Sequence, residues 1–303
     1  MIQFRGLRKR FGDKKALDDL SFEVPNGVLF GFLGPNGSGK TTTMRALVGL
    51  IHLDAGTITV DGRPIGSETR ERIGYMPEER GLYPKMTVRD QLEYIAGLYA
   101  LSSVEVRRTS ERWIERLELG EFSNLRIEAL SLGNKQRVQL AVAFIHNPEI
   151  MLLDEPFSGL DPIGTESVKA VLDEAAREGK HVIFSSHQLD LVESFCEQAA
   201  IIDRGHLVLS GKVADLTLGD TAIYEIVSEH RDALADALSR FPGVKVLDEP
   251  GPVLSFSVSG TTTANDVLAL ALSLGGVESF GARRIRLSEA FIRAIEHERF
   301  GAL

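Results

Sequence analysis

Short apolar runs, separated by stretches with helical spacing, dominate the first two thirds of the chain. These strand-like runs occur at residues 2–7, 28–33, 150–153, 181–185 and 199–202. Continuous apolar runs of this length are typical of strands buried in a parallel sheet. Because helical patterns lie between several of them, we predict an α/β domain over residues 1–215.

The segment at residues 80–147 has a different pattern. Apolar residues recur at helical spacing over residues 87–101, 104–119 and 132–146, with no strand pattern between them. Thr87 has the side-chain oxygen of an N-cap, and Asp90 follows three positions later as an acidic variant of a capping box. We therefore predict a mostly helical subdomain that interrupts the sheet.

After residue 220 the pattern changes to short strands and amphipathic helices. Strand patterns lie at residues 221–228, 244–248, 253–258 and 277–285, helix patterns at 229–241 and 263–274, and a closing helix at 288–298 with Ser288 as its N-cap. The order β-α-β-β-α-β is that of a ferredoxin-like, split βαβ unit. We predict a small accessory α+β domain over residues 220–303.

Length, charge and cysteine content narrow the class of protein. The 303 residues favour two domains, and the net charge of −9 argues against nonspecific affinity for nucleic acid. No apolar run approaches the roughly 20 residues that span a bilayer. We expect a cytoplasmic chain that reaches the inner face of a membrane only through a protein partner. The single cysteine, Cys196, is expected to be a buried helix residue.

A glycine-rich loop follows the apolar run at residues 28–33 and precedes a helical pattern. It reads Gly34, Pro35, Asn36, Gly37, Ser38, Gly39, Lys40, Thr41. Glycines let backbone N–H groups turn inward to a phosphate, and the positive end of the following helix points at the same anion. Lys40 is expected to reach the terminal phosphates and the Thr41 hydroxyl to bind Mg²⁺, with Thr42 beside them. The sequence therefore predicts a site for a nucleotide phosphate chain.

Two carboxylates end the apolar run at residues 150–153. A buried strand delivers Asp154 and Glu155 to its exposed end, where Asp154 can hold Mg²⁺ and Glu155 can polarise a water in line with the γ-phosphate. This pattern alone is weak, because apolar strands often end in acidic turns. Its value comes from its occurrence in one chain with the glycine-rich loop.

In the last part of the helical segment, before the acidic strand, lies an element that identifies a family. It reads Leu130, Ser131, Leu132, Gly133, Asn134, Lys135, Gln136, Arg137 and is similar to the LSGGQxQR signature of ATP-binding cassette (ABC) proteins. Up to about residue 211 the chain resembles the nucleotide-binding subunit of an ABC transporter, a P-loop NTPase. The resemblance implies that Ser131, Gly133 and Asn134 contact the ATP held by a second ATPase subunit, so that two subunits enclose two nucleotides.

The same resemblance assigns three further positions. Asp161, in the motif Ser158, Gly159, Leu160, Asp161, matches the loop that links the two active sites of the dimer. His187 matches a histidine that contacts the γ-phosphate, although a histidine after a strand is by itself more often structural. Phe11 falls where the family has an aromatic ring on adenine, and a turn or core phenylalanine is the alternative reading.

Two departures from the family pattern point to a branch. Glu78 stands where a glutamine that contacts Mg²⁺ is usual, so we expect altered metal sensitivity rather than lost activity. Leu132 and Asn134 replace the Gly and Gln of the signature. The segments at residues 76–84 and 131–136, which contain these departures, resemble those of bacterial export-type cassettes of the sodium- and drug-efflux kind. Such cassettes carry an added carboxy-terminal domain.

The function predicted from these features is that of an ATP-hydrolysing subunit that dimerises around two MgATP and drives a separate membrane permease. Glu155 would be the general base, and ATP-driven closure of the dimer would be the power stroke. The main alternative is a soluble, non-transport ABC ATPase that acts on a macromolecular complex. A non-hydrolysing regulatory module is a second alternative, which the presence of both Glu155 and His187 disfavours.

Overall fold

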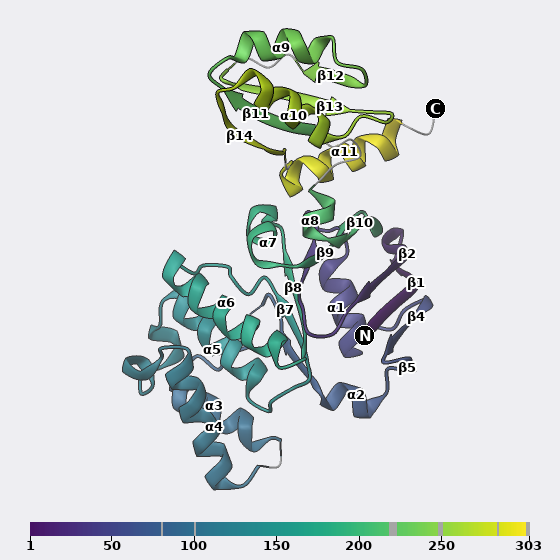
Figure 1. The fold of residues 1–303 in the computed structure, drawn as a ribbon. Coiled ribbons are helices and arrows are strands. Elements are labelled where there is room, and N and C mark those ends of the chain that lie inside the picture. Colours follow the sequence, from purple (N-terminus) through teal and green to yellow (C-terminus); the bar gives the residue numbers. More distant parts are fainter. Residues whose placement is uncertain (80, 100, 218–222, 248–250, 284, 301–303) are drawn as a thin grey trace. The chain divides into compact units, whose positions relative to one another are not determined.

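The computed structural model describes the whole chain except residues 80, 100, 218–222, 248–250, 284 and 301–303 (Figure 1). It divides into two compact units, Met1–Val213 and Ala214–Leu303. Among the described residues, the first unit contains two sheets and a group of helices, and the second contains one sheet and several helices.

The first sheet of the first unit is antiparallel, with the strand order β2-β1-β4-β5. Its strands are β1 (Ile2–Phe11), β2 (Lys14–Val24), β4 (Ala55–Val60) and β5 (Arg63–Pro64). The predicted strand at residues 2–7 is confirmed and extends to Phe11. Register shifts interrupt the pairing of β1 with β2, so the alternation of buried and exposed side chains is irregular in both strands.

The second sheet has six strands in the order β10-β9-β3-β8-β7-β6. They are β10 (His206–Lys212), β9 (Gln198–Asp203), β3 (Leu29–Leu33), β8 (His181–Ser186), β7 (Ile150–Asp154) and β6 (Ile73–Met76). All neighbours are parallel except β10 and β9. The four apolar runs predicted as buried strands are β3, β7, β8 and β9, and nearly all of their residues are buried.

One hydrophobic core joins the two sheets. Helix α1 (Lys40–Val48) contributes Met44 and Leu47 to a cluster that also contains Phe4 and Phe22 of the first sheet and Phe30 of the second. Three further helices of this unit are α2 (Ser67–Glu71), α6 (Pro162–Arg177) and α7 (Leu189–Phe195). Helix α8 (Val213–Leu216) begins at the last residue of the first unit and continues into the second. The core fixes α1, and with it the loop that precedes α1.

Cys196 is buried, as predicted, but it is not a helix residue. It is the C-cap of α7 and has extended backbone angles, because the chain leaves the helix there to enter β9. Burial raises the pKa of its thiol well above the ordinary value. The side chain therefore acts as a small apolar group.

Three helices form the segment predicted as helical. They are α3 (Val88–Gly97), α4 (Ser103–Arg116) and α5 (Leu132–Phe144). Thr87 caps α3, as predicted, by accepting a hydrogen bond from the Asp90 backbone N–H at 3.1 Å, but the Asp90 side chain does not complete the predicted capping box. Helix α4 begins one residue earlier than predicted, because Ser102 and Glu105 form a reciprocal capping box.

The second unit has an antiparallel sheet in the order β12-β13-β11-β14. Its elements are β11 (Ile223–Ser228), α9 (Arg231–Ser239), β12 (Val244–Leu247), β13 (Val253–Val258), α10 (Ala264–Leu274), β14 (Val277–Ala282) and α11 (Leu287–Phe300). This order of elements and strands is that of the predicted ferredoxin-like unit. Leu234 and Leu238 of α9 pack in its core.

One prediction for the second unit is wrong, and parts of others fall outside the described residues. Ser288 is not an N-cap, because α11 already begins at Leu287 and the Arg286 carbonyl accepts hydrogen bonds from the N–H groups of Glu289 and Ala290. Parts of the predicted strands at 221–228, 244–248 and 277–285, and of the domain boundary near 220, fall on residues outside the described part of the chain.

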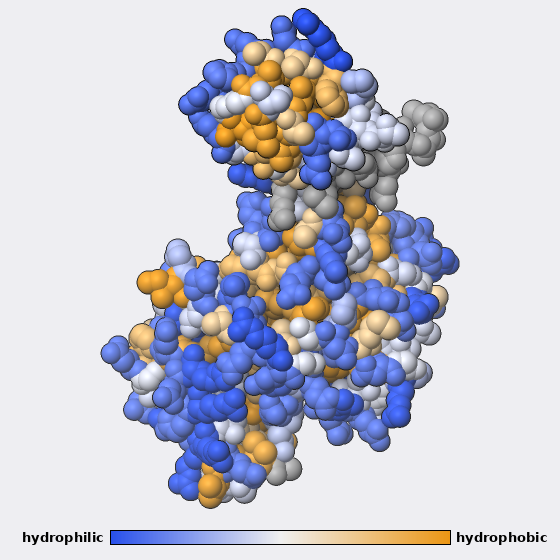
Figure 2. Space-filling view, viewed as in Figure 1, coloured by the Kyte–Doolittle hydropathy of each residue, from blue (hydrophilic) through white to orange (hydrophobic). Residues whose placement is uncertain are grey.

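Polar side chains cover much of the visible face of the first unit, whereas apolar residues gather on the second unit around α10, where Leu272 and Leu274 are exposed (Figure 2). Within the described residues, every helix is too short or too polar to cross a bilayer.

Candidate functional site

The parallel strands bring four loops to one edge of the six-stranded sheet. The glycine-rich loop follows β3, Glu155 follows β7, and His187 follows β8. Glu78 lies two residues after β6, which pairs with β7. Ligands of open α/β sheets bind at the carboxyl ends of the strands. A ligand-binding or catalytic site is therefore expected at this edge.

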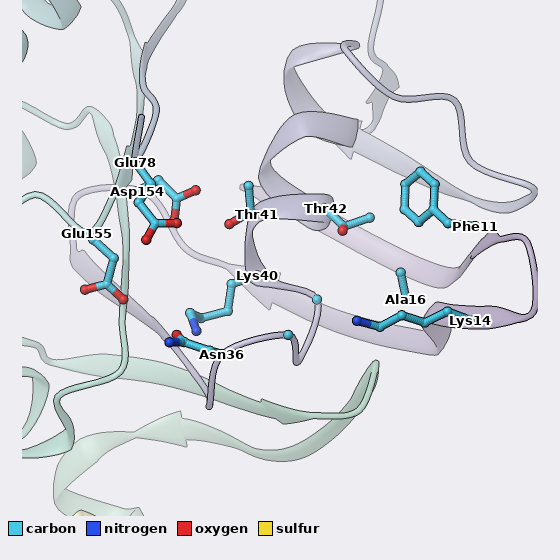
Figure 3. Close-up of a pocket in the computed structure, with 12 residues that line it drawn as sticks. Phe11, Lys14, Ala16, Asn36, Lys40, Thr41, Thr42, Glu78, Asp154 and Glu155 are labelled. Atoms are coloured by element: carbon cyan, nitrogen blue, oxygen red, sulfur yellow. The ribbon is translucent and has the colours of Figure 1, made fainter. Parts of the chain in front are cut away.

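A cavity of about 240 Å³ opens at this edge (Figure 3). Its lining residues are Phe11, Lys14, Ala16, Asn36, Gly37, Gly39, Lys40, Thr41, Thr42, Glu78, Asp154 and Glu155. The structure thus brings together most residues that the sequence predicted for one nucleotide, whereas His187 is held at its border by a contact with Glu155. Lys14 and Ala16 were not predicted, because their strand, β2, was not recognised from the sequence.

The glycine-rich loop has a conformation that few residues other than glycine adopt. Gly39 has a φ of 115°, and a Cβ there would lie 2.6 Å from the carbonyl oxygen of Ala16. Gly34 has a φ of 155°, and a Cβ there would lie 2.2 Å from the carbonyl oxygen of Ile202. Contacts this short exclude any side chain. Both glycines are therefore required by the loop itself.

Lys40 is buried at the start of α1, with 7% of its surface exposed. Its Nζ donates hydrogen bonds to the carbonyl oxygens of Gly34 at 2.5 Å and Pro35 at 3.2 Å. Burial lowers the pKa of Lys40, and the carboxylates of Glu155, Asp154 and Glu78 act in the opposite direction. The cation therefore lies between an anion-binding loop and three acidic side chains.

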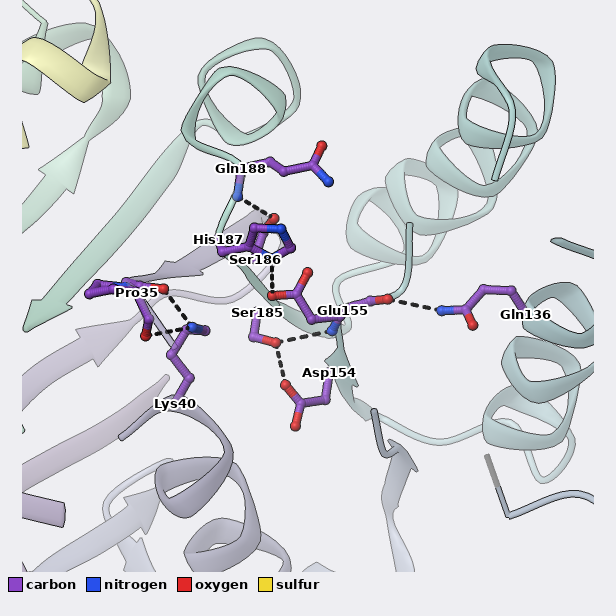
Figure 4. Close-up of polar contacts among 10 residues, drawn as sticks. Pro35, Lys40, Gln136, Asp154, Glu155, Ser185, Ser186, His187 and Gln188 are labelled. Atoms are coloured by element: carbon purple, nitrogen blue, oxygen red, sulfur yellow. Dashed lines mark hydrogen bonds and ion pairs between the residues drawn. The ribbon is translucent and has the colours of Figure 1, made fainter. Parts of the chain in front are cut away.

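Asp154 and Glu155 are held by the neighbouring strand β8 (Figure 4). The Ser185 hydroxyl donates to Asp154 Oδ1 at 2.5 Å and accepts the backbone N–H of Glu155 at 3.0 Å. His187 Nδ1 lies 2.9 Å from Glu155 Oε1. These contacts connect three of the residues that the sequence proposed for catalysis and metal binding.

Asp154 Oδ2 is a buried oxygen without a hydrogen-bond partner among the described residues, and the side chain as a whole is 1% exposed. A buried carboxylate oxygen left without a donor is suited to a cation. The described residues contain no group of three or more His, Cys, Asp or Glu side chains that could hold a metal by themselves. A cation here would therefore need further oxygens, such as the Thr41 hydroxyl and phosphate groups.

The backbone of Glu155 is in the left-handed region, with a φ of 54°. A non-glycine residue in this region is strained, and such strain is commonly held in place at functional sites. The Glu155 carbonyl oxygen accepts a hydrogen bond from Gln136 Nε2 at 2.9 Å. Sequence reasoning had assigned no role to Gln136 or to Ser185.

The remaining predicted residues do not line this cavity. Ser131 caps α5 and accepts the Asn134 N–H at 3.2 Å, and Asp161 caps α6 and accepts the Gly164 N–H at 2.8 Å. A Cβ on Gly133 would lie 3.2 Å from the carbonyl oxygen of Gly159, so the starts of α5 and α6 are close to each other. These residues form a second cluster, separate from the residues around Lys40.

Phe11, at the end of β1, is half exposed at the border of the cavity. Lys9 Nζ lies 5.5 Å from the centre of its ring. A ring with one open face beside a polar cavity is able to stack on a planar ligand.

Comparisons with known proteins agree with this geometry. The sequence model of the family described as "ABC transporter" matches residues 17–158. The chain is 35% identical over 295 residues to the uncharacterized ABC transporter ATP-binding protein YhaQ of Bacillus subtilis, which covers 97% of this chain and 98% of the relative. It is also 35% identical over 245 residues to the Nod factor export ATP-binding protein I of Burkholderia orbicola, covering 79% of this chain and 81% of the relative.

A solved dimeric structure, described as a post-hydrolysis state of an ATP-binding cassette bound to ADP and Pi, matches with a TM-score of 0.65 and 25% identity. The match covers 70% of this chain and 99% of that one. The fold and the site point to the same family as the relative that is matched along almost its whole length. The chain therefore belongs to the family of ABC transporter ATP-binding proteins, and it is the ATP-hydrolysing subunit of such a transporter.

Proposed function

We propose that this ATPase subunit powers an exporter, by dimerising around two MgATP and driving a separate membrane permease from the inner face of the cell membrane. The single observation that carries the proposal is the phosphate loop with Asp154 and Glu155 in one cavity. The direction of transport is supported by the relative named for Nod factor export. Residues 1–215 would be the ATPase cassette, with its helical subdomain at about 80–147, and residues 220–303 an accessory domain.

Mg²⁺ fits the donor set of the cavity. The unpartnered Asp154 Oδ2 and the Thr41 hydroxyl are hard oxygen ligands, and Glu78 adds a third in place of the usual glutamine. The ion would neutralise charge on the β- and γ-phosphates. Three carboxylates near one lysine make the cavity more acidic than phosphate binding alone would favour, so we expect the nucleotide to bind together with its metal.

In the hydrolysis step, Glu155 accepts a proton from the attacking water, and His187 orients both the carboxylate and the γ-phosphate. The Nδ1–Oε1 distance of 2.9 Å supports this pairing. Lys40, Asn36 and the backbone N–H groups of the loop bind the phosphates, and Phe11 stacks on the adenine. The buried position of Lys40 supports strong interaction with an anion, because little water competes for it.

Ser131, Gly133, Asn134 and Asp161 would act on the nucleotide of a second ATPase subunit. Their positions outside the cavity of their own chain support this role, as does the apolar surface beside them. Leu132 is 49% exposed and Ile163 is 74% exposed. The likeness to a dimeric cassette supports pairing of two subunits.

The permease would contact the helical subdomain after Glu78. Several large side chains are exposed there, namely Tyr83, Tyr94, Leu98 and Tyr99, and the rings of Tyr83 and Tyr94 meet edge to face at 5.7 Å. Exposed aromatic side chains that follow Glu78, a lining residue of the cavity, are suited to contact a cytoplasmic helix of the permease. No role in binding nucleic acid is proposed for this acidic chain.

The test is the variant Glu155→Gln in the purified chain. We expect it to bind MgATP and form a stable ATP-bound dimer with little turnover, because the amide cannot accept the proton. Glu121→Gln, an exposed site outside the cavity, is the matched control and should hydrolyse ATP as the parent does. Parent-like turnover in Glu155→Gln would refute the assignment of the base.

A further inference from the structure

The peptide of Glu155 is held from two sides by side chains far away in the sequence. Ser185 accepts its N–H at 3.0 Å, and Gln136 donates to its C=O at 2.9 Å (Figure 4). Between these two hydrogen bonds the residue keeps its φ of 54°. The direction of the Glu155 side chain depends on this backbone conformation, since φ and ψ set the direction of the Cα–Cβ bond.

Gln136 is well placed to hold this carbonyl oxygen. It lies in the second turn of α5 and is only 5% exposed. Three residues later on the same face of the helix, Gln139 donates to the carbonyl oxygen of Pro77, the residue before Glu78. Two buried amides of one helix thus hold the two segments that carry Glu155 and Glu78 into the cavity.

We propose that Gln136 is a positioning residue for ATP hydrolysis, which keeps the strained peptide of Glu155 in the orientation that directs its carboxylate toward the attacking water. The proposal rests on the role of Glu155 as general base. Without the amide donor, the Glu155 peptide is free to turn toward an unstrained conformation, and the carboxylate leaves its place. Misplacing a reacting group by about 1 Å can cost on the order of 100-fold in rate.

The placement of Gln136 has a further consequence. Helix α5 begins beside Ser131, which is proposed to contact the nucleotide of the partner subunit. Five residues later the same helix holds the base of its own chain. A single helix therefore contains both the residue proposed to contact the partner's nucleotide and the residue that holds the base of its own chain.

The first experiment compares Gln136→Met with the control Gln91→Met in the purified chain. Methionine keeps the length of the side chain and removes the donor. Gln91 is also a buried glutamine of the helical subdomain; it accepts the Tyr83 N–H at 2.8 Å and does not line the cavity. We expect kcat to fall at least tenfold in Gln136→Met only, with the KM for ATP within twofold of the parent in both variants. Equal kcat values in the two variants, or a loss that lies in KM, would overturn the proposal.

A second variant, Gln136→Glu, distinguishes the loss of the hydrogen bond to the Glu155 carbonyl from a change in the packing of the side chain. An ionised carboxylate cannot donate to the Glu155 carbonyl, whereas the protonated acid can. The kcat of Gln136→Glu relative to the parent should therefore rise as the pH falls from about 8 to about 5, since burial favours the neutral acid. The same ratio for Gln136→Met should stay flat.

The variants also separate this proposal from the function on which it rests. If Glu155→Gln loses turnover while Gln136→Met keeps it, only the positioning role is refuted. If Glu155→Gln keeps parent turnover, the assignment of the base fails, and the positioning role fails with it. A flat pH ratio for Gln136→Glu would contradict the hydrogen bond as the cause.

Discussion

Ser185→Ala is the substitution whose cost follows most directly from the structure. The Ser185 side chain is fully buried at the end of β8. Its hydroxyl donates to Asp154 Oδ1 at 2.5 Å and accepts the Glu155 N–H at 3.0 Å. Alanine removes both hydrogen bonds and leaves a carboxylate oxygen and an N–H group without their partner.

The two lost hydrogen bonds set the expected loss of stability. A hydrogen bond to a charged group contributes about 1.5–3 kcal/mol, and a buried N–H left unpaired costs about 1–3 kcal/mol. We therefore expect a loss of about 3–5 kcal/mol in the free energy of unfolding of the first unit. Ser186, the next residue, is also buried, but its hydroxyl only accepts the Gln188 N–H at 3.0 Å. Ser186→Ala should cost about 1 kcal/mol.

The assay is urea unfolding followed by tryptophan fluorescence. The sequence has one tryptophan, and Trp113 is buried in the first unit against Phe144, with ring centres 4.9 Å apart. Its signal therefore isolates the first unit from the second, which matters because a chain of two units need not unfold in one step. If Ser185→Ala loses no more stability than Ser186→Ala, the assignment of the two hydrogen bonds to Ser185 is wrong.

Two further substitutions test the cavity. Glu78→Gln should raise the free Mg²⁺ needed for half-maximal hydrolysis, because it removes one of the three carboxylates around Lys40; a titration that coincides with that of the parent would count against the metal contact. Phe11→Ala should raise the KM for ATP roughly 3- to 10-fold with kcat within twofold, as expected for the loss of one aromatic contact of about 0.5–1.5 kcal/mol, and Phe11→Tyr should restore the KM; no change in the KM would favour a structural ring.

The central strands could be predicted from the sequence because both faces of each strand are covered. In β3, β7, β8 and β9 the apolar side chains follow one another, so the pattern is clear at short range. The strands β2, β4 and β10 were not predicted, because polar and partly exposed side chains interrupt their apolar pattern. The strands β5 and β6 were not predicted either, since they have only two and four residues. Missing β2 also meant missing Lys14 and Ala16 as lining residues of the cavity.

The motifs predicted the local arrangement of the cavity, since the phosphate loop and the acidic pair lie at the ends of parallel strands. Contacts across the fold were not predictable. Gln136 and Ser185 lie 19 and 30 residues away from Glu155, and nothing in their sequence neighbourhood indicates that they hold its peptide. The start of helix α11 was a third weakness, because Ser288, one residue inside this helix, has the same sequence signal as a cap.

The most direct test of the central claim is to recover the partners of the tagged Glu155→Gln chain from gently solubilised membranes in the presence of MgATP. The variant should hold the ATP-bound state and keep its complex together during purification. We expect a polytopic membrane protein to be recovered with the chain, and to be lost when Lys40 is also replaced by methionine. Recovery of soluble proteins or nucleic acid alone would contradict the transporter function and leave the ATPase fold without a permease.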